Sequence, residues 1–285
     1  MILTHTAERE GKLLSFLRTE LQLSSSAVKR LKWKDAFLVN GQASHTDRKI
    51  APGDVITAIL DEQTPEFPPE FAPLDILYED DAILAVDKPA GLLMHPSFYR
   101  NTGTLANRIL GYYQSTSQPC AVHPVSRLDR DTFGVVLLAK NAHIHARMMQ
   151  ALKDRAIQKT YEALVYGVPP AEGVWQFPIA RKEGESLLRE VRPDGQAAET
   201  KFSLLAQADG AAKLQLQPVT GRTHQLRVHC AYAGHPILGD RQYGTEASLA
   251  LWEYPHQQLC AVRVTFPHPI TKEPMTIQSR QGVCL

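Results

Sequence analysis

The chain has 285 residues, 44% of them hydrophobic and 21% charged, and 31 Lys and Arg residues against 30 Asp and Glu residues give a net charge of +1. These proportions are ordinary for a globular protein, and the length is sufficient for one large domain and one small one. No stretch approaches the roughly 20 apolar residues that cross a bilayer, and residues 1–11 lack the apolar segment of a signal peptide. The four cysteines include no C-x-x-C pair. We therefore expect a cytoplasmic protein without a membrane span, a disulfide framework or a zinc cage.

The N-terminal fifth of the chain has the pattern of a small α+β unit. Leucines at helical spacing predict a first helix over residues 13–21, and Ser24 offers an N-cap for a second helix. A strand over residues 37–39 then enters an Asn-Gly turn, and a Pro-Gly-Asp turn precedes a strand over residues 55–60. This order resembles, over residues 8–60, the small RNA-binding module called S-four or alpha-L.

The second of these helices is strongly basic, with four cations and an aromatic residue in positions 29–34. Such a patch follows phosphates in RNA-binding proteins, although a solvated helix face has much the same composition. Proteins with the S-four module use this helix and the following strand as a basic surface. The resemblance therefore implies that four residues contact RNA: Lys29, Arg30, Lys32 and Lys34. The alternative is an appendage that only packs on the larger domain.

Residues 62–73 contain four prolines among acidic residues, a spacing that no helix or sheet ladder tolerates. We predict an extended, semi-rigid linker here. Residues 61–86 hold eight Asp or Glu residues and no Lys or Arg, so the near-zero net charge hides a basic excess elsewhere. The linker would separate a module over residues 1–61 from a larger domain over residues 74–285.

The larger domain contains many predicted strands and few predicted helices. Helices are predicted over residues 104–112 and 142–154, and strands over residues 82–86, 135–139, 159–167, 173–180, 198–205, 213–217 and 259–266. Residues 181–195 are charged and contain glycine, and we expect a mobile hairpin there that faces RNA. The mixture predicts an α+β fold with a mixed, largely antiparallel sheet and flanking helices, beside the small N-terminal α+β module.

A charged segment, Arg127 to Asp131, stands immediately before Gly134 and the apolar run 135–139. The run predicts a buried strand, which places Asp129 at the edge of the core, close to Arg127 and Arg130 along the backbone. Neighbouring positive charge favours the ionised form of a carboxylate, as a nucleophile or an ionic anchor requires. A charged turn that only caps a strand accounts for the same spacing equally well.

The segment Arg-Leu-Asp-Arg-Asp-Thr-x-Gly over residues 127–134 resembles the active-site signature of the RluA-type RNA pseudouridine synthases. The resemblance implies that Asp129 is the catalytic aspartate. Two departures concern substrate contacts and local packing: Ser126 stands where the family usually has His, and Phe133 where it usually has Ser. A Lys-Pro-x-Gly turn at residues 88–91 resembles the family's first motif, and we expect it to support the floor of the site.

Two further blocks resemble the same family. The first is Lys159-x-Tyr161, whose tyrosine in the family lies against the target uracil. An aromatic ring can hold the uracil by stacking, and its phenol could assist the late removal of a proton. The alternative is a tyrosine that only packs in the core. The second runs from residue 218 to residue 240, with a predicted helix over residues 220–233. The arginine that matches Arg227 pairs with the catalytic aspartate in the family, and the planar guanidinium suits a bidentate clamp on a carboxylate.

Three ordered blocks over residues 83–270 imply an RNA pseudouridine synthase, which isomerises uridine within RNA. The reaction needs neither redox change nor water, so we expect no metal and no nucleotide cofactor. The target uracil must leave the stack of bases in the RNA, and Arg127 would fill the space that the uracil vacates. Three more residues would contact RNA: Arg130, Arg222 and His224. Ribosomal RNA is the favoured partner, tRNA the second, and a monomer is the default state.

Two other functions remain open from the residues alone. A non-catalytic RNA-binding factor could keep the same fold, but it would not require Asp129, Tyr161 and Arg227 together. A metal-dependent nuclease could use Asp129 with Asp131, although the flanking arginines would repel the metal ion. A pair of zinc ligands at His224 and His229 is disfavoured, because no glutamate lies between them and five residues do not return to one helix face.

Overall fold

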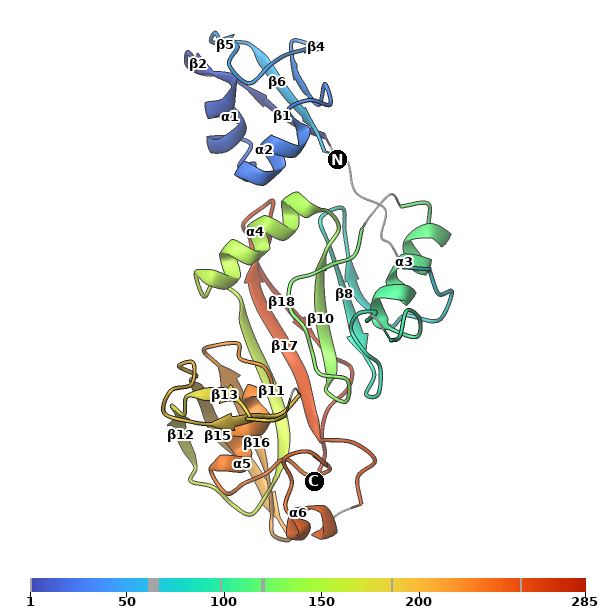
Figure 1. Ribbon diagram of the computed structural model, residues 1–285, viewed down its shortest axis with the longest axis vertical. Coiled ribbons are helices and arrows are strands. Elements are labelled where there is room, and N and C mark those ends of the chain that lie inside the picture. The colour runs from blue at the N-terminus through green and yellow to red at the C-terminus, as the bar shows by residue number, and fades with distance from the viewer. Residues whose placement is uncertain (1, 61–66, 98, 119–120, 186, 252) are drawn as a thin grey trace.

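The computed structural model describes residues 2–60, 67–97, 99–118, 121–185, 187–251 and 253–285. Within these segments, no helix combines the length and the apolar character that a membrane crossing requires. The chain forms a small N-terminal unit and a larger unit built on one extensive sheet (Figure 1).

The N-terminal unit is a four-stranded antiparallel sheet in the order β1-β6-β3-β4, with a separate two-stranded pair, β2 and β5. Its elements are β1 (Ile2–Thr6), β2 (Gly11–Lys12), α1 (Leu13–Thr19), α2 (Ser25–Leu31), β3 (Phe37–Val39), β4 (Gln42–Ala43), β5 (Lys49–Ile50) and β6 (Val55–Ile59). The two predicted helices and two predicted strands are confirmed, and Ser24 caps α2 by accepting from the backbone N–H of Ala27 at 3.1 Å. Strand β1 was not predicted, because it has no buried residue and hence no apolar face.

The N-terminal unit has its own hydrophobic core. Leucine and phenylalanine side chains of α1, among them Phe16, pack with the inward residues of β3 and β6. All fully buried members of this cluster lie between Ala7 and Leu60. Burial of apolar surface is the main source of folding free energy, so this part of the chain carries a core that does not depend on the large sheet.

The larger unit is a mixed sheet whose main path is β12-β15-β16-β11-β17-β10-β8-β7. Its strands are β7 (Ile76–Glu79), β8 (Ile83–Lys88), β9 (His123–Pro124), β10 (Phe133–Ala139), β11 (Gln158–Tyr166), β12 (Glu172–Trp175), β15 (Thr200–Ala208), β16 (Ala211–Pro218), β17 (Leu259–Pro267) and β18 (Pro274–Gln278). Its helices are α3 (Leu105–Ser115), α4 (Ala142–Lys153), α5 (Gln225–Tyr232) and α6 (Glu246–Leu251). Every pairing is antiparallel except β10 with β17. The α+β prediction is confirmed.

Helices cover the two faces of the central strands. Leu84 and Val86 of β8 share a cluster with α3 and α5, whereas Ile83 and Ala85 share another with α4. A strand that is buried on both faces loses the alternation of polar and apolar residues, which explains the continuous apolar runs of β8 and β10. Tyr161 of β11 points to the face of α3 and α5 together with alternate residues of its own strand.

Strands β10 and β17 approach unusually closely at Gly134. This residue has φ +104°, and a Cβ atom there would lie 2.4 Å from the carbonyl oxygen of Ala261. Only glycine combines a left-handed backbone with that approach. The end of β10 that follows the charged segment is therefore fixed against β17.

The described half of the predicted linker is not a free spacer. Residues 62–66 lie outside the described residues, but residues 67–73 run along α3. The amide of Asn107 donates to the carbonyl of Pro68 at 2.7 Å, and a Cβ atom on Gly111 would lie 2.3 Å from the carbonyl oxygen of Glu70. The second half of the proline-rich segment therefore packs against the larger unit.

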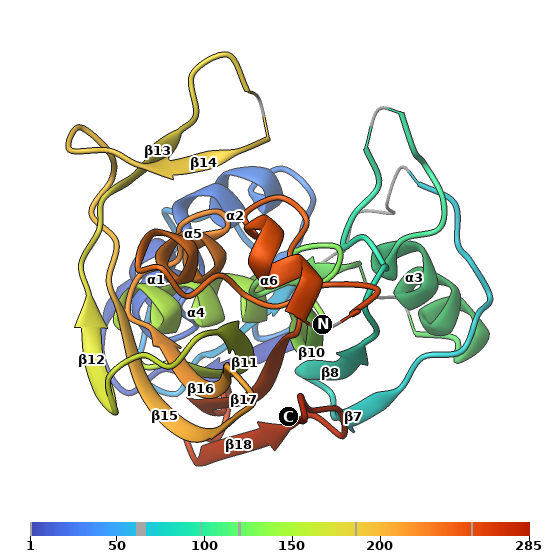
Figure 2. The same cartoon turned by 90° about the horizontal axis from the view of Figure 1, so that it is seen from below.

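Two other predicted elements differ from the structure. The predicted strand over residues 173–180 is divided into β12 and β13 (Ile179–Arg181), and β13 forms a hairpin with β14 (Arg189–Val191). The helix predicted from residue 220 begins only at Gln225, because the Gln225 side chain accepts from the Arg222 N–H at 3.0 Å and holds a turn in place of the first helical turn. Strand β18 and helix α6 were not predicted. Figure 2 shows the β13–β14 hairpin projecting from the sheet beside α5.

Candidate active site

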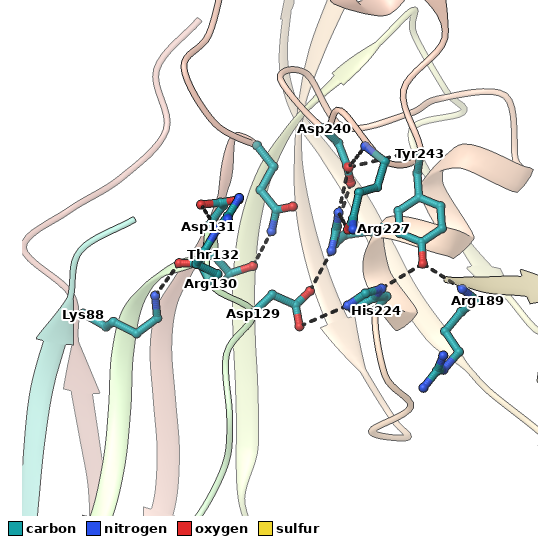
Figure 3. A network of polar contacts seen from close by, with 12 residues as sticks. Lys88, Asp129, Arg130, Asp131, Thr132, Arg189, His224, Arg227, Asp240 and Tyr243 are labelled. Carbon is teal, nitrogen blue, oxygen red and sulfur yellow. Dashed lines mark hydrogen bonds and ion pairs between the residues drawn. The ribbon is translucent and has the colours of Figure 1, made fainter. Parts of the chain in front are cut away.

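Asp129 lies in the loop between β9 and β10, and neighbours from other segments hold two of the residues that follow it (Figure 3). The Lys88 ammonium donates to the carbonyl of Arg130 at 2.8 Å. The Gln257 amide donates to the hydroxyl of Thr132 at 2.6 Å, from the segment that leads into β17. The carboxylate of Asp129 keeps 30% of its surface exposed. The loop thus presents Asp129 to a ligand on a fixed backbone.

Lys88 supports this loop from inside the protein. It is fully buried, and its ammonium donates to the carbonyls of Pro89 at 3.0 Å, Leu92 at 2.7 Å and Arg130 at 2.8 Å. Burial lowers the pKa of Lys88 to about 8, against the raising effect of the nearby aspartates. A three-proton ammonium matches three carbonyl acceptors, so the expected supporting role of the Lys-Pro-x-Gly turn has a concrete basis.

Arg227 of α5 is 5% exposed and reaches Asp129, with 3.2 Å between Nη1 and Oδ2. Its bidentate partner, however, is Asp240, with contacts of 2.7 Å from both Nε and Nη2. Nη2 also donates to the Gln242 side chain at 2.6 Å. The expected bidentate clamp therefore lies on Asp240, and Asp129 receives a single contact from the same guanidinium. Buried charges require such pairing.

The two arginines that flank Asp129 in sequence do not lie against it, contrary to our prediction. Arg130 is exposed and forms a bidentate ion pair with Asp131, with contacts of 3.0 and 2.8 Å. Arg127 is also exposed. Consecutive side chains in an irregular loop point in different directions, so proximity along the backbone did not become contact. The two carboxylates of the segment also face different arginines, which does not favour a shared metal between Asp129 and Asp131.

Tyr161 projects from β11 into the core beneath the site and is 7% exposed. Burial, and then the charge of Asp129, raise the pKa of the Tyr161 phenol above its ordinary value. The phenol therefore stays protonated near neutral pH and is a poor base. Its ring borders a pocket that also includes Ser126, Lys159 and Arg263, and burial lowers the pKa of Lys159 to about 8.

His224 also lies at Asp129, with 3.9 Å between Nε2 and Oδ1. Its Nδ1 atom is 2.8 Å from the hydroxyl of Tyr243, and that hydroxyl accepts from the backbone N–H of Arg189 in β14 at 2.9 Å. Burial lowers the pKa of His224, although Asp129 opposes this shift. We predicted His224 only as an RNA contact, and the structure places it in the polar network of the aspartate (Figure 3).

The two departures from the family signature have separate surroundings. Phe133 is 6% exposed and packs edge-on against His256, with 5.6 Å between ring centroids. Ser126 borders the pocket beside Tyr161. Of the two, Ser126 thus lies at a small pocket, whereas Phe133 is part of the packing against the segment that leads into β17.

The remaining predicted RNA contacts lie in other parts of the chain. Arg222 is exposed, and its Nε donates to the carbonyl of Ala197 at 3.0 Å. In the N-terminal unit, Lys29 and Lys32 are exposed while Arg30 is half-buried. Lys34 is exposed as well. None of these residues contacts Asp129 in the described structure.

Three residues of the site were not identified from the sequence: Asp240, Gln242 and Tyr243. All three follow Gly239, which has φ +74°. A Cβ atom at this position would lie 2.3 Å from the carbonyl oxygen of His256, so only glycine fits here. A helix that carries a buried arginine needs a second acidic partner, and Asp240 was the available acid in the same block. The need of the buried arginine for this partner was therefore the feature of the sequence that could have identified Asp240.

The chain is similar to known proteins over most of its length. A family model described as RNA pseudouridylate synthase matches residues 82–232. An uncharacterized RNA pseudouridine synthase of Bacillus subtilis, YhcT, is 36% identical over 265 residues, which cover 92% of this chain and 86% of that protein. The ribosomal large subunit pseudouridine synthase D of Pasteurella multocida is 33% identical over 280 residues, covering 93% and 86%.

Solved structures give the same result for the fold. Human RNA pseudouridylate synthase domain containing 1 superposes with a TM-score of 0.61 at 22% identity, covering 76% of this chain and 93% of that one. Human RNA pseudouridylate synthase domain containing 4 does so with a TM-score of 0.57 at 25% identity, covering 72% and 87%. The charged loop with Asp129, the buried Arg227 and the tyrosine of β11 thus stand on a shared architecture, and the chain belongs to the RNA pseudouridine synthase family of isomerases.

Proposed function

We propose that the protein converts specific uridines in structured RNA, ribosomal RNA first, to pseudouridine, with Asp129 as the initiating carboxylate. In this isomerisation the bond between N1 and the ribose breaks and a bond from C5 to the ribose forms. The C5 hydrogen leaves as a proton and N1 gains one, so atoms and electrons balance without a cofactor. The observation that carries the proposal is a partly exposed carboxylate on a fixed loop, held by a buried arginine at 3.2 Å.

Asp129 would act as the ionised group. The Arg227 guanidinium and the His224 ring lie on its two oxygens, at 3.2 and 3.9 Å, and supply positive or donor character on both sides. A carboxylate nucleophile reacts in its ionised form. Attack on the ribose carbon and attack on the uracil ring both start from this state.

Tyr161 would lie against the uracil ring. Its ring borders the pocket next to the loop, and its raised pKa supports a role in stacking over one as a phenolate base. Arg127, exposed beside Asp129, would enter the stack that the flipped base leaves. Arg130, Arg222 and the cations of the β13–β14 hairpin would contact phosphates around the site.

The N-terminal unit would bind RNA as a second module. Trp33 is 76% exposed, and the Lys32 ammonium lies 4.9 Å from the centre of its ring. A cation patch with an exposed aromatic ring suits single-stranded RNA, where bases stack and phosphates pair with cations. Ribosomal RNA is favoured over tRNA because relatives such as the protein of Pasteurella multocida are named for the large ribosomal subunit. The proposed boundaries remain 1–61, 62–73 and 74–285, and the proposed state is a monomer in the cytoplasm.

The test is tritium release from RNA labelled at uracil carbon 5. Unmodified large-subunit ribosomal RNA, small-subunit ribosomal RNA and tRNA serve as parallel substrates for the wild type and for Asp129→Asn. We expect release from large-subunit RNA by the wild type and none by the variant. Retention of full activity in Asp129→Asn would reject the assigned carboxylate, and tight binding of RNA with no release by the wild type would favour a non-catalytic factor.

A further inference from the structure

A continuous chain of polar contacts leads from the β13–β14 hairpin to the candidate catalytic carboxylate (Figure 3). It begins at the backbone N–H of Arg189, which donates to the Tyr243 hydroxyl at 2.9 Å. That hydroxyl is 2.8 Å from His224 Nδ1. His224 Nε2 in turn faces Asp129 Oδ1 at 3.9 Å. Four segments that are distant in sequence thus meet along one line.

The backbone donor at the start fixes the direction of the chain. Because the Arg189 N–H can only donate, the Tyr243 oxygen accepts there, which leaves its own proton available for Nδ1 of His224; we assign this direction to the contact. The ring hydrogen of a neutral imidazole then lies on Nε2, the atom that faces Asp129. Burial raises the pKa of Tyr243 and lowers that of His224, so both groups keep these forms near neutral pH.

Tyr243 is fixed against the hairpin by more than its hydroxyl. Its ring packs against an apolar cluster that includes Ile179 of β13 and Val191 of β14. The Arg227 guanidinium carbon lies 4.9 Å from the ring centre on the other side. The tyrosine therefore contacts the hairpin and the arginine that holds Asp129 at the same time.

His224 keeps an unfavourable backbone to occupy its place. It has φ +56° and ψ +19°, a left-handed conformation that is uncommon outside glycine, although His adopts it more often than most residues do. A strained residue persists where surrounding contacts determine its position. Here the determining contacts are those of the imidazole with Tyr243 and Asp129.

We propose that His224 and Tyr243 are positioning residues that connect the β13–β14 hairpin to Asp129, so that docking of the hairpin on RNA orients the carboxylate for reaction. The inference rests on the proposed function. Arg227 donates to Oδ2 at 3.2 Å, and the His224 ring stands beside Oδ1 with its Nε2 atom at 3.9 Å, so the two side chains together restrict rotation of the carboxylate. Arg181 at the end of β13 and Lys182 directly after it are exposed, and RNA contacts there would set the position of the Tyr243 hydroxyl.

The first test is Tyr243→Phe, which keeps the ring over Arg227 and removes only the hydroxyl. Single-turnover rates with enzyme in excess report the chemical step, and filter binding reports the affinity for RNA. We expect the rate to fall about fivefold to tenfold, the effect of one hydrogen bond, with an unchanged Kd. The control is Tyr232→Phe at the end of α5, a tyrosine that is 60% exposed, which should leave both quantities as in the wild type.

The second test compares two amides at position 224. The Gln amide reaches the place of Nε2 and can still donate to Asp129, whereas the Asn amide reaches only the place of Nδ1. Asn tolerates the left-handed backbone better than Gln does. If the donor to Asp129 matters, His224→Gln keeps more activity than His224→Asn; if the backbone alone matters, the order is reversed. The double variant of His224→Asn with Tyr243→Phe should be no slower than His224→Asn alone.

Two outcomes would overturn the inference: a wild-type rate in Tyr243→Phe, or Asn exceeding Gln at position 224. These results are distinguishable from failure of the proposed function. In that case the wild type itself releases no tritium, or Asp129→Asn keeps its activity. A rise in Kd with an unchanged single-turnover rate in Tyr243→Phe would also reject positioning, since it would assign the hydroxyl to RNA binding.

Discussion

At the scale of single residues, the site is organised by a buried arginine with two acidic partners of unequal exposure. Asp240 is 1% exposed and takes two contacts of 2.7 Å from Arg227, whereas Asp129 takes one at 3.2 Å. The buried pair offsets the desolvation of the guanidinium. Asp129 is thereby left with one oxygen free of Arg227, so the same cation can hold the aspartate and leave it available for reaction.

Lys88 predicts how the activity depends on pH. Its folded-state pKa of about 8 is below the ordinary lysine value, so the ammonium with three donors exists below that pH and the amine with two donors above it. As pH rises through about 8, Lys88 loses one proton, and one of its three carbonyl partners then faces the nitrogen lone pair. The hydrogen bonding that holds the Arg130 carbonyl weakens as a result. We therefore expect kcat to fall on the alkaline side of this value.

The measurement is the rate of tritium release at saturating RNA across that pH range. In Lys88→Met, kcat should be lower throughout and should lack this alkaline limb. If the alkaline fall in kcat persists unchanged in Lys88→Met, it comes from titration of the uracil or of another side chain, and Lys88 is not its source.

At the scale of elements, local signals and long-range packing contributed differently. Caps and turns such as Ser24 at α2 and the Asn-Gly turn after β3 were predicted, since they depend on neighbours within four residues. Elements without their own pattern were missed. Within the described residues, strand β18 pairs with β17 alone, and the start of α5 is decided by a side-chain turn.

Gly134 allows the effect of close strand approach to be measured. Gly134→Ala adds a Cβ atom 2.4 Å from the Ala261 carbonyl oxygen at φ +104°. We expect the free energy of unfolding to fall by about 2–5 kcal/mol, from strain and overpacking together. Denaturation in urea measures the change.

The matched control is Gly210→Ala in the turn between β15 and β16. Gly210 has φ +78°, and a Cβ atom there meets no atom within 4 Å. The Gly210→Ala substitution should lower the free energy of unfolding by about 1–2 kcal/mol, the cost of the left-handed backbone alone. Equal losses at the two positions would show that close approach of β10 and β17 contributes nothing.

At the scale of the whole molecule, the N-terminal unit has a separate core and a cationic helix on its surface. The proposed RNA contact at this helix predicts a salt-dependent affinity. Replacing Lys29 and Lys32 by Gln should reduce the slope of log Kd against log salt by about 1.4–1.8, because each lost phosphate contact removes about 0.7–0.9. The kcat at saturating RNA should not change.

The control replaces Lys12 and Lys49, which are exposed partners in the β2–β5 pair of the same unit. This variant has the same net charge as the Lys29 and Lys32 variant, and it should keep the wild-type slope. Identical slopes for the two double variants would mean that only net charge matters, and the helix would then lose its assignment as an RNA contact.

The sequence by itself determined the α+β class, the strands around the charged segment, and the family, because three motifs in order each carry local information. Through that resemblance it also predicted Asp129, Tyr161 and Arg227 as site residues, and the structure has Arg227 at Asp129. Only the tertiary structure decided the partners: Arg130 turned to Asp131, Arg227 to Asp240, and His224 to Tyr243 and Asp129. The physical reason is that a side-chain contact depends on the direction of both backbones, and the backbones that meet here are brought together by a sheet whose pairing is non-local.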